Sequence, residues 1–163
     1  MAVVYISLGS NMGKRRENCL LALDKLGQAY VGSLTGVSAF YLSQPVDCPR
    51  QNWFVNAAVR LETRLDPFAL LDQTKRIETQ LGRRINAVRF GPRIIDLDIV
   101  LYDDQILDMP ELTIPHPRMH KRRFVLQPIC DIDDRIIHPV FKEPLTRLLA
   151  GIPESGQKLI RIT

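Results

Sequence analysis

Residues 53–102, WFVNAAVRLETRLDPFALLDQTKRIETQLGRRINAVRFGPRIIDLDIVLY, decide the fold. Alternate residues of 53–63 are apolar, which is typical of a strand with one buried face. Asp66 and Pro67 place a capping residue before a proline at the first helical position, so a helix begins there. Residues 95–102 are largely apolar on both faces and predict a buried strand. The stretch therefore contains a strand, a helix, a loop and a second strand.

The N-terminal part of the chain adds three further elements. Residues 3–8 predict a buried strand, 9–11 a turn, 14–26 a helix with one apolar face, and 34–42 a second strand. The order β-α-β-β-α-β predicts an α+β fold, a ferredoxin-like sandwich in which helices flank an antiparallel sheet.

After the last of these strands we expect C-terminal additions to the sandwich. They comprise a short strand or turn after Asp103, a proline-rich loop at 115–117, and helices around 122–130 and 144–149. With 163 residues, no repeat and no linker, the chain is expected to form a single domain over 1–163.

Composition limits the class of protein. Hydrophobic residues make up 45% and charged residues 25%, as in globular proteins. No apolar run approaches the ~20 residues of a membrane span, and the N-terminus lacks a basic leader, so we expect a cytoplasmic protein that does not span a membrane. We also expect a monomer. The net charge of +4 indicates an anionic partner: nucleic acid, an acidic membrane surface or a phosphorylated small molecule.

Asp96 and Asp98 lie two residues apart inside the last strand of this stretch. Residues at this spacing share one face of a strand, so both carboxylates project together from an apolar segment. Neighbouring buried carboxylates repel each other and need a cation or a proton, and magnesium suits paired oxygen ligands. The alternative, acids at a strand end that face water, is disfavoured by the apolar flanks.

Four arginines precede the acid pair within eleven residues, in a segment without clear periodicity that we expect to be a loop: Arg83, Arg84, Arg89 and Arg93. A guanidinium group is a fixed fork of donors that matches phosphate oxygens, so clustered arginines beside paired acids indicate a bound polyphosphate. The alternative is a solvated basic loop. Because Arg93 is three residues before Asp96, we expect the loop to bring Arg93 to the acid pair.

Two further segments are candidate binding elements. Residues 116–124, HPRMHKRRF, contain two histidines and four cationic side chains, which suits either a nucleotide phosphate tail or nucleic acid, or simply a charged helix start. On the strand 53–63, Asn56 shares a face with Phe54, so its amide can pair with a heterocycle; a satisfied structural asparagine is the alternative.

Residues 89–100, RFGPRIIDLDIV, closely resemble the signature of the 6-hydroxymethyl-7,8-dihydropterin pyrophosphokinase family. ISLGSN at 6–11, FVNA at 54–57 and PHPRM at 115–119 also resemble that family in order and spacing. The resemblance covers nearly the whole chain. It implies a ferredoxin-like sandwich that transfers pyrophosphate from ATP to the pterin hydroxymethyl group, leaving AMP, a step of tetrahydrofolate biosynthesis.

The resemblance implies roles for individual residues. Asp96 and Asp98 hold two magnesium ions that bridge the triphosphate of ATP, while Arg83 and Arg93 contact the transferring phosphates. Further ATP-binding residues are Lys75, Glu78, His116 and Arg122. The pterin is bound by Val46, Phe54, Asn56, Phe90 and Phe124. Some members carry Trp, Gln and Tyr where this chain has Phe90, Lys75 and Phe54. The nucleophile is the substrate's own hydroxyl, and the motif contains no obvious general base.

Two other functions fit part of the pattern. A ferredoxin-like sandwich with a pI of about 9.1 suits an RNA-binding module, but the chain lacks the aromatic base-stacking pattern of such modules, so we expect no nucleic-acid partner. A metal-dependent nuclease or phosphatase could also be built on an acid pair. Formation of AMP from ATP and magnesium, with and without the pterin, separates these functions.

Overall fold

A computed structural model of the chain describes residues 1–82 and 92–163. Two of the predicted site residues, Arg83 and Phe90, lie outside the described residues. The elements follow in the order β1 (Ala2–Ser10), α1 (Arg15–Leu26), β2 (Ser33–Val37), β3 (Tyr41–Ser43), β4 (Phe54–Thr63), α2 (Pro67–Gln80), β5 (Asp96–Tyr102), β6 (Leu107–Asp108), β7 (Thr113–Ile114), the 3-10 turn η1 (Met119–Lys121), α3 (Arg123–Ile132), α4 (Leu145–Ala150) and β8 (Leu159–Arg161).

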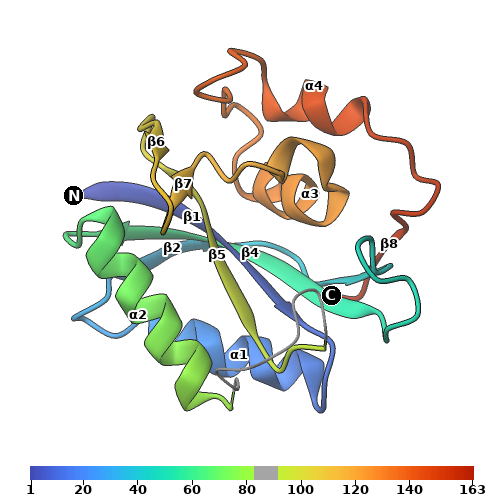
Figure 1. The fold of residues 1–163 in the computed structure, drawn as a ribbon, viewed down its shortest axis with the longest axis horizontal. Helices are drawn as coiled ribbons and strands as arrows, with labels where there is room; N and C mark the ends of the chain where they lie inside the picture. The colour runs from blue at the N-terminus through green and yellow to red at the C-terminus, as the bar shows by residue number, and fades with distance from the viewer. Residues whose placement is uncertain (83–91) are drawn as a thin grey trace.

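One antiparallel sheet organises the molecule (Figure 1). Its strands lie in the order β5-β1-β4-β3-β8, and β2 pairs with the part of β4 that β3 leaves uncovered. The β-α-β-β-α-β order and the ferredoxin-like sandwich predicted from the sequence are therefore confirmed. No helix within 1–82 or 92–163 has the length and apolar composition of a membrane span.

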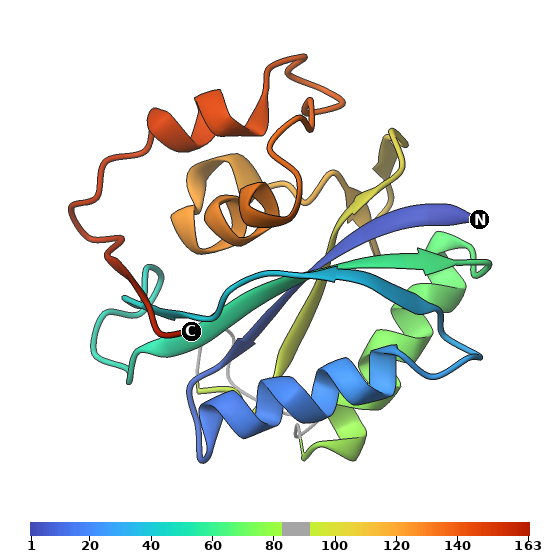
Figure 2. The same ribbon diagram turned by 180° about the vertical axis from the view of Figure 1, so that it is seen from behind.

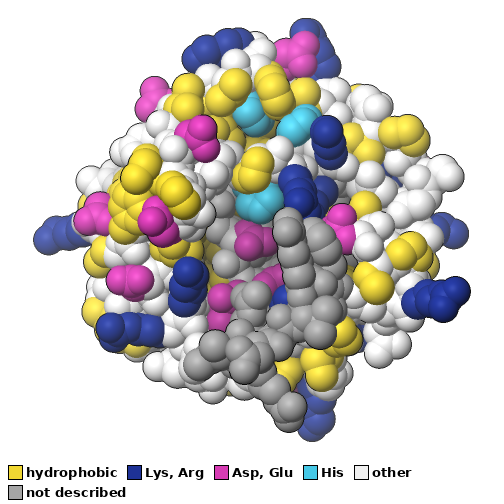
Figure 3. All heavy atoms as spheres, in the orientation of Figure 1, with side chains coloured by type: hydrophobic (Ala, Val, Ile, Leu, Met, Phe, Trp, Pro, Cys, Tyr) yellow, Lys and Arg dark blue, Asp and Glu magenta, His cyan; other side chains and the backbone are white. Residues whose placement is uncertain are grey.

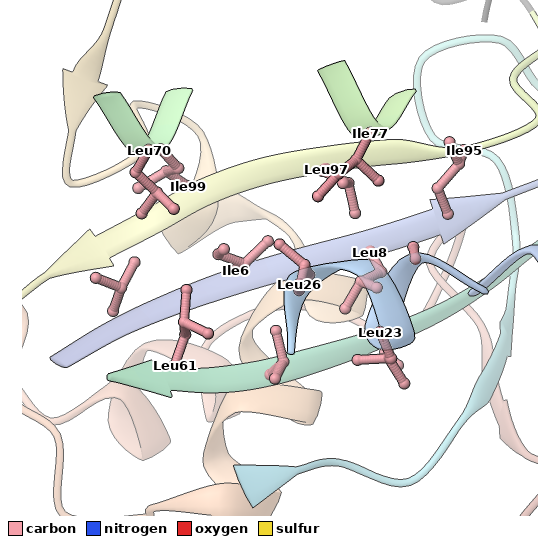
Figure 4. Packing of buried hydrophobic residues seen from close by; sticks show 14 of the residues in the cluster. Ile6, Leu8, Leu23, Leu26, Leu61, Leu70, Ile77, Ile95, Leu97 and Ile99 are labelled. Carbon is pink, nitrogen blue, oxygen red and sulfur yellow. The ribbon is translucent and has the colours of Figure 1, made fainter. Parts of the chain in front are cut away.

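Helices α1 and α2 cover one face of the sheet (Figures 1 and 2). Asp66 begins α2 as predicted, because its side chain accepts the backbone N–H groups of Phe68 and Ala69 at 2.9 Å each. Figure 4 shows the apolar side chains that interlock between this face and the two helices, among them Ile6, Leu8, Leu23, Leu26, Leu61, Leu70, Ile77, Ile95, Leu97 and Ile99.

Helices α3 and α4 lie over the opposite face but cover only part of it (Figures 1 and 2). Tyr5, Ala58 and Leu101 belong to a second buried cluster there, together with residues of α3. The part of this face left open lies over the C-terminal half of β1 and the N-terminal halves of β4 and β5. Asp96, Asp98 and Asn56 line the cleft over this open part of the face. The additions after β5 therefore leave room for the candidate site.

The strand predicted over 34–42 is two strands. Val37 is opposite Val59 and Tyr41 is opposite Asn56, so an interval of four residues in this segment faces an interval of three residues on β4. Ser38 still pairs with Ala58, because its hydroxyl accepts the Ala58 N–H and its own N–H donates to the Ala58 carbonyl, so the extra residue lies between Ser38 and Tyr41. A bulge leaves no trace in the apolar pattern, so the sequence predicted one strand.

Candidate active site

The open part of the sheet is the floor of a cleft of about 490 Å³, a size typical of small-ligand sites. Acidic, basic and histidine side chains gather at the centre of the face shown in Figure 3. All eleven predicted site residues that the structure describes line this cleft: Val46, Phe54, Asn56, Lys75, Glu78, Arg93, Asp96, Asp98, His116, Arg122 and Phe124.

Strand register places the acid pair beside the predicted pterin reader. Asp96 is opposite Gly9 on β1, which is opposite Asn56 on β4. Neighbouring strands lie about 4.8 Å apart, so Asp96 and Asn56 are separated by roughly two strand spacings, about 10 Å. Asp98 is likewise opposite Ser7. Gly9 and Ser7 are small residues next to these functional side chains, so the sheet surface has a hollow there with space for a ligand.

Gly9 is required by the close approach of Asn56. A Cβ atom at this position would lie 2.7 Å from the Asn56 Oδ1, too close for any side chain. Asn56 is 3% exposed as a residue, and its side-chain Nδ2 donates to the Ser43 hydroxyl. The asparagine is therefore held in one orientation at the cleft floor, as a reader of a planar ligand must be.

Asp96 and Asp98 are half-buried, whereas the sequence predicted a buried pair. The difference arises because β5 is an edge strand of the sheet, and the cleft gives its acids access to solvent. The intervening Leu97 is buried, and its outward N–H donates to Glu78 Oε2 of α2 at 3.0 Å. Glu78, predicted as a nucleotide ligand, thus also fixes the strand segment that carries both aspartates.

Asn11, which the sequence analysis placed in a turn and in the family-like stretch 6–11 without giving it a role, joins three segments of the site. Its Oδ1 accepts the Arg93 N–H at 2.7 Å, and its own N–H donates to the Arg93 carbonyl at 3.0 Å. Its Nδ2 donates to Gln51 Oε1 at 2.8 Å. The end of β1 therefore positions both the approach to β5 and the loop between β3 and β4. An amide residue directly after a buried strand was the available signal.

A bulge in β5 positions the backbone of His116, which lines the same cleft as the acid pair. Tyr5 is opposite Leu101 and Ile6 is opposite Ile99, which leaves Val100 as the extra residue. The Val100 carbonyl accepts the His116 N–H at 2.9 Å. The bulge thus connects the strand of the aspartates to the loop that follows β7.

The imidazole of His116 is neutral at neutral pH. Burial and then the charges of Arg122 and Arg118 lower the pKa of His116 to about 4, against a smaller opposing effect of Asp96. Its Nδ1 accepts the Arg118 N–H at 3.1 Å, so the proton is assigned to Nε2. In this tautomer the ring offers a neutral N–H donor to an anionic ligand.

The segment 116–124 divides between site and scaffold. His116, Arg118, Arg122 and Phe124 line the cleft. The other charged members do not. His120 contacts the Phe141 ring edge-on, with centroids 4.7 Å apart, while the guanidinium of Arg123 donates to the Gln157 carbonyl at 2.9 Å. Asp47 and Gln51 also line the cleft and were given no role from the sequence, and Arg118 was included only as a member of the segment 116–124.

No cluster of three His, Cys, Asp or Glu side chains that could hold a metal by itself occurs in the described ranges. Cys19 is buried in the core, and burial raises its pKa to about 12. Cys48 lines the cleft.

Because no such metal-binding cluster occurs in the described ranges, any metal at Asp96 and Asp98 would take further ligands from the substrate or from water.

The family model of 7,8-dihydro-6-hydroxymethylpterin-pyrophosphokinase (HPPK) matches residues 5–134, which include every described residue of the predicted site. The chain belongs to this family.

Relatives agree with this assignment. The chain is 40% identical to a 2-amino-4-hydroxy-6-hydroxymethyldihydropteridine pyrophosphokinase of Pseudomonas aeruginosa, over 94% of this chain and 93% of the relative. An enzyme of the same name from Bacillus subtilis is 42% identical over 82% of this chain and 80% of the relative. The HPPK match gives no support to the RNA-binding or nuclease alternatives.

The fold has solved counterparts. A crystal structure of Plasmodium falciparum HPPK-DHPS with pteroate matches with a TM-score of 0.72 at 16% identity, over 91% of this chain and 42% of that longer chain. At this identity the likeness shows the fold alone. The ferredoxin-like sandwich of this chain is thus the one found in HPPK domains.

Proposed function

We propose that this member of the HPPK family transfers the pyrophosphoryl group of ATP to the hydroxymethyl group of 6-hydroxymethyl-7,8-dihydropterin, giving AMP and the pterin diphosphate. The family match over 5–134 carries the proposal. The cleft supports it, because acids, phosphate-binding cations and an amide reader meet there. AMP formation from ATP and magnesium only when the pterin is present is the expected result. Pterin-independent hydrolysis of ATP, or no AMP at all, would refute it.

The reaction is proposed to depend on two magnesium ions held by Asp96 and Asp98. Their carboxylates are hard oxygen ligands on one strand face, and the small residues Ser7 and Gly9 opposite them leave room for phosphate oxygens and water. Magnesium commonly binds through one or two carboxylates plus substrate phosphates, so this donor set fits. When bound, magnesium neutralises charge on the triphosphate and aligns it for displacement.

The chemistry is an in-line displacement at the β-phosphorus of ATP. The pterin hydroxyl oxygen forms the new bond to phosphorus and releases its proton to water, the bond to the oxygen bridging the α- and β-phosphates breaks, and AMP leaves with that oxygen. Arg93 and Arg122 are proposed to donate to the phosphates, and neutral His116 to donate through its Nε2–H. Arg83 is proposed to donate to the transferring pyrophosphoryl group as well. These donors stabilise charge that develops in the transition state.

The pterin is proposed to lie beside Asn56. The amide pairs with the donor and acceptor edge of the heterocycle, and Phe124 covers one face, because flat aromatic ligands require rings above and below them. Val46 and Phe54 complete the wall of the pocket, and Phe90 is proposed as a further cover.

The nucleotide is proposed to extend from the acid pair toward α2. Lys75 is exposed on this helix at the rim of the cleft, where it can reach a nucleotide, whereas Glu78 is 5% exposed and bound to the β5 backbone. A single domain over 1–163, a cytoplasmic location and a monomeric state stay predictions.

A further inference from the structure

An ion pair crosses the rim of the cleft between two segments far apart in sequence. Arg122 Nη2 donates to Asp47 Oδ2 at 3.0 Å. The Arg122 side chain is 13% exposed and that of Asp47 36%. The guanidinium carbon also lies 5.5 Å from the centroid of the Phe124 ring, so the proposed phosphate donor and the proposed pterin cover are in contact.

The cations around this pair explain why a carboxylate is present. Arg93, Arg118, Arg122 and Lys75 all line the cleft. Arg122 and Arg118 both disfavour protonation of His116, which shows that their charges act within one small volume. Asp96, Asp98 and Glu78 line the same cleft and offset part of this positive charge. At Arg122 the counterion is Asp47.

Asp47 also lies in the middle of a segment whose two ends are anchored. At one end, the Gln44 N–H donates to the Lys158 carbonyl at 3.0 Å. At the other, Gln51 is bound to Asn11 at 2.8 Å. The pair with Arg122 ties the centre of this segment, next to Val46 on the proposed pterin side, to the proposed phosphate side.

We infer that Asp47 is a positioning residue that acts as a placeholder for phosphate: it binds Arg122 in the unliganded protein and is displaced from it by the nucleotide triphosphate. The inference rests on the proposed function. A triphosphate carries several negative charges and outcompetes one exposed carboxylate for the guanidinium. Nucleotide binding thereby releases Asp47, at the centre of the segment 44–51, from Arg122. This alters the wall of the cleft on the proposed pterin side.

Calorimetric titration with a non-hydrolysable ATP analogue and magnesium tests the competition. Asp47→Asn keeps the shape and removes the charge, so the analogue is expected to bind about two- to fivefold more tightly, the range for a partly exposed ion pair. A gain in affinity is a change that mere loss of structure does not produce. Unchanged or weaker binding would overturn the inference.

The chain offers a matched control for net charge. Glu62 pairs with Arg60 at 3.1 Å, and its side chain is 36% exposed, as is that of Asp47. Glu62→Gln removes the same charge from an equivalent pair that lies outside the cleft. Its affinity for the analogue is expected to equal that of the unmodified protein; an equal gain in both variants would mean a general charge effect and would refute a role of Asp47.

A double-mutant cycle establishes whether Asp47 acts through Arg122. In an Arg122→Ala background, Asp47→Asn is expected to leave the affinity for the analogue unchanged, because the guanidinium for which the ligands compete is gone. If the second substitution still tightened binding two- to fivefold, the carboxylate would act by direct repulsion of the phosphates, and the placeholder role would be wrong.

The alkylation rate of Cys48 tests the ion pair between Asp47 and Arg122 without any nucleotide. It follows Asp47 directly, lines the cleft and is half-buried, whereas burial raises the pKa of Cys19 to about 12 and of Cys130 to about 11. Arg122→Ala is expected to increase alkylation of Cys48, followed by peptide mass spectrometry, at least about twofold. Unchanged or slower labelling would contradict this role of the ion pair.

These measurements separate the two proposals. If the unmodified protein bound no ATP analogue, the proposed function would fail while the Cys48 experiment still tested the ion pair. If it bound the analogue and Asp47→Asn did not tighten binding, the placeholder inference alone would fail.

Discussion

At Asp96 and Asp98, the smallest change that tests the proposed chemistry removes charge at nearly constant shape. Asp96→Asn or Asp98→Asn is expected to lower kcat by about 100-fold or more, because weakened magnesium binding forfeits several kcal/mol of transition-state stabilisation. Both side chains are half-buried at the cleft, so thermal unfolding should change little. AMP formation at saturating magnesium measures the effect, with Asp108→Asn on β6 as a control outside the cleft. Near-normal turnover in either variant would refute the two-metal proposal.

Asn56 tests the pterin side separately. Asn56→Ala is expected to cost roughly 1–3 kcal/mol of pterin affinity, because buried ligand groups lose their partner. ATP affinity should be nearly unchanged, since the proposed nucleotide contacts lie on the side of the acid pair. Calorimetry with each ligand is the measurement, and Phe124→Ala should show the same selectivity through lost stacking. Equal losses for both ligands would indicate a folding defect, and no loss for the pterin would refute the assignment.

His116 links the site to stability. Its folded pKa of about 4 is below the usual 6.5, so as pH falls through 6.5 the unfolded chain takes up a proton that the folded chain refuses. Stability is therefore lost between pH 6.5 and 4 and levels off below that, by roughly 3 kcal/mol at most. Urea unfolding across this range should show the loss in the unmodified protein. The variant His116→Gln has no titrating group at this position, so its loss of stability over this range should be smaller by the contribution of His116. Parallel curves of stability against pH for the two proteins would contradict the lowered pKa of His116.

At the scale of elements, the edge of β5 depends on α2. Glu78 accepts the Leu97 N–H, which no neighbouring strand covers on that side. Glu78→Ala leaves this donor in a buried place without its acceptor and is expected to destabilise the protein by roughly 1–3 kcal/mol. Glu78→Gln keeps an acceptor oxygen and should cost less. Urea denaturation measures both. If Glu78 served only the nucleotide, both variants would retain full stability.

At the scale of the whole molecule, the C-terminal segment 154–163 supports both sides of the cleft. β8 pairs with β3, and the Lys158 N–H donates to Gln44 at 3.2 Å. Gln157 accepts the first N–H of α3, from Arg123, at 3.0 Å. Among the described residues that line the main cleft, none comes from this segment. It therefore acts on the site through the elements it holds.

Deletion of residues 154–163 is expected to lower the unfolding free energy by about 2–4 kcal/mol, as several hydrogen bonds are lost. KM for both substrates should rise more than kcat falls, because the segment 44–51 and the start of α3 lose an anchor while the acid pair is untouched. Steady-state kinetics and thermal unfolding measure these effects. Gln157→Ala, which removes only side-chain bonds, should give a smaller change in the same direction. Unchanged stability and KM would show that the segment is dispensable.

Local chemistry made much of the fold predictable. The Asp66-Pro67 start of α2 is a short-range signal, β-rich composition marked β1, and apolar periodicity marked β4 and both long helices, each to within a residue or two. The strand pair β2 and β3 was predicted as one, and β8 was not predicted. Bulges and a short edge strand are defined by their partners in the sheet, and a single strand's pattern does not contain that information.

For the site, the sequence by itself determined which residue types are available: two carboxylates two residues apart, arginines before them, a histidine segment and an asparagine on a strand face. Only the tertiary structure decided which of them meet. Strand register places Asp96, Gly9 and Asn56 in one row, the Val100 bulge positions the backbone of His116 at the same cleft, and His120 and Arg123 turn to the scaffold. The contacts of Asp47 with Arg122 and of Asn11 with Gln51 join positions 75 and 40 residues apart. Pairings of this kind depend on packing between distant segments, whereas helix starts and strand faces depend on neighbours in the chain.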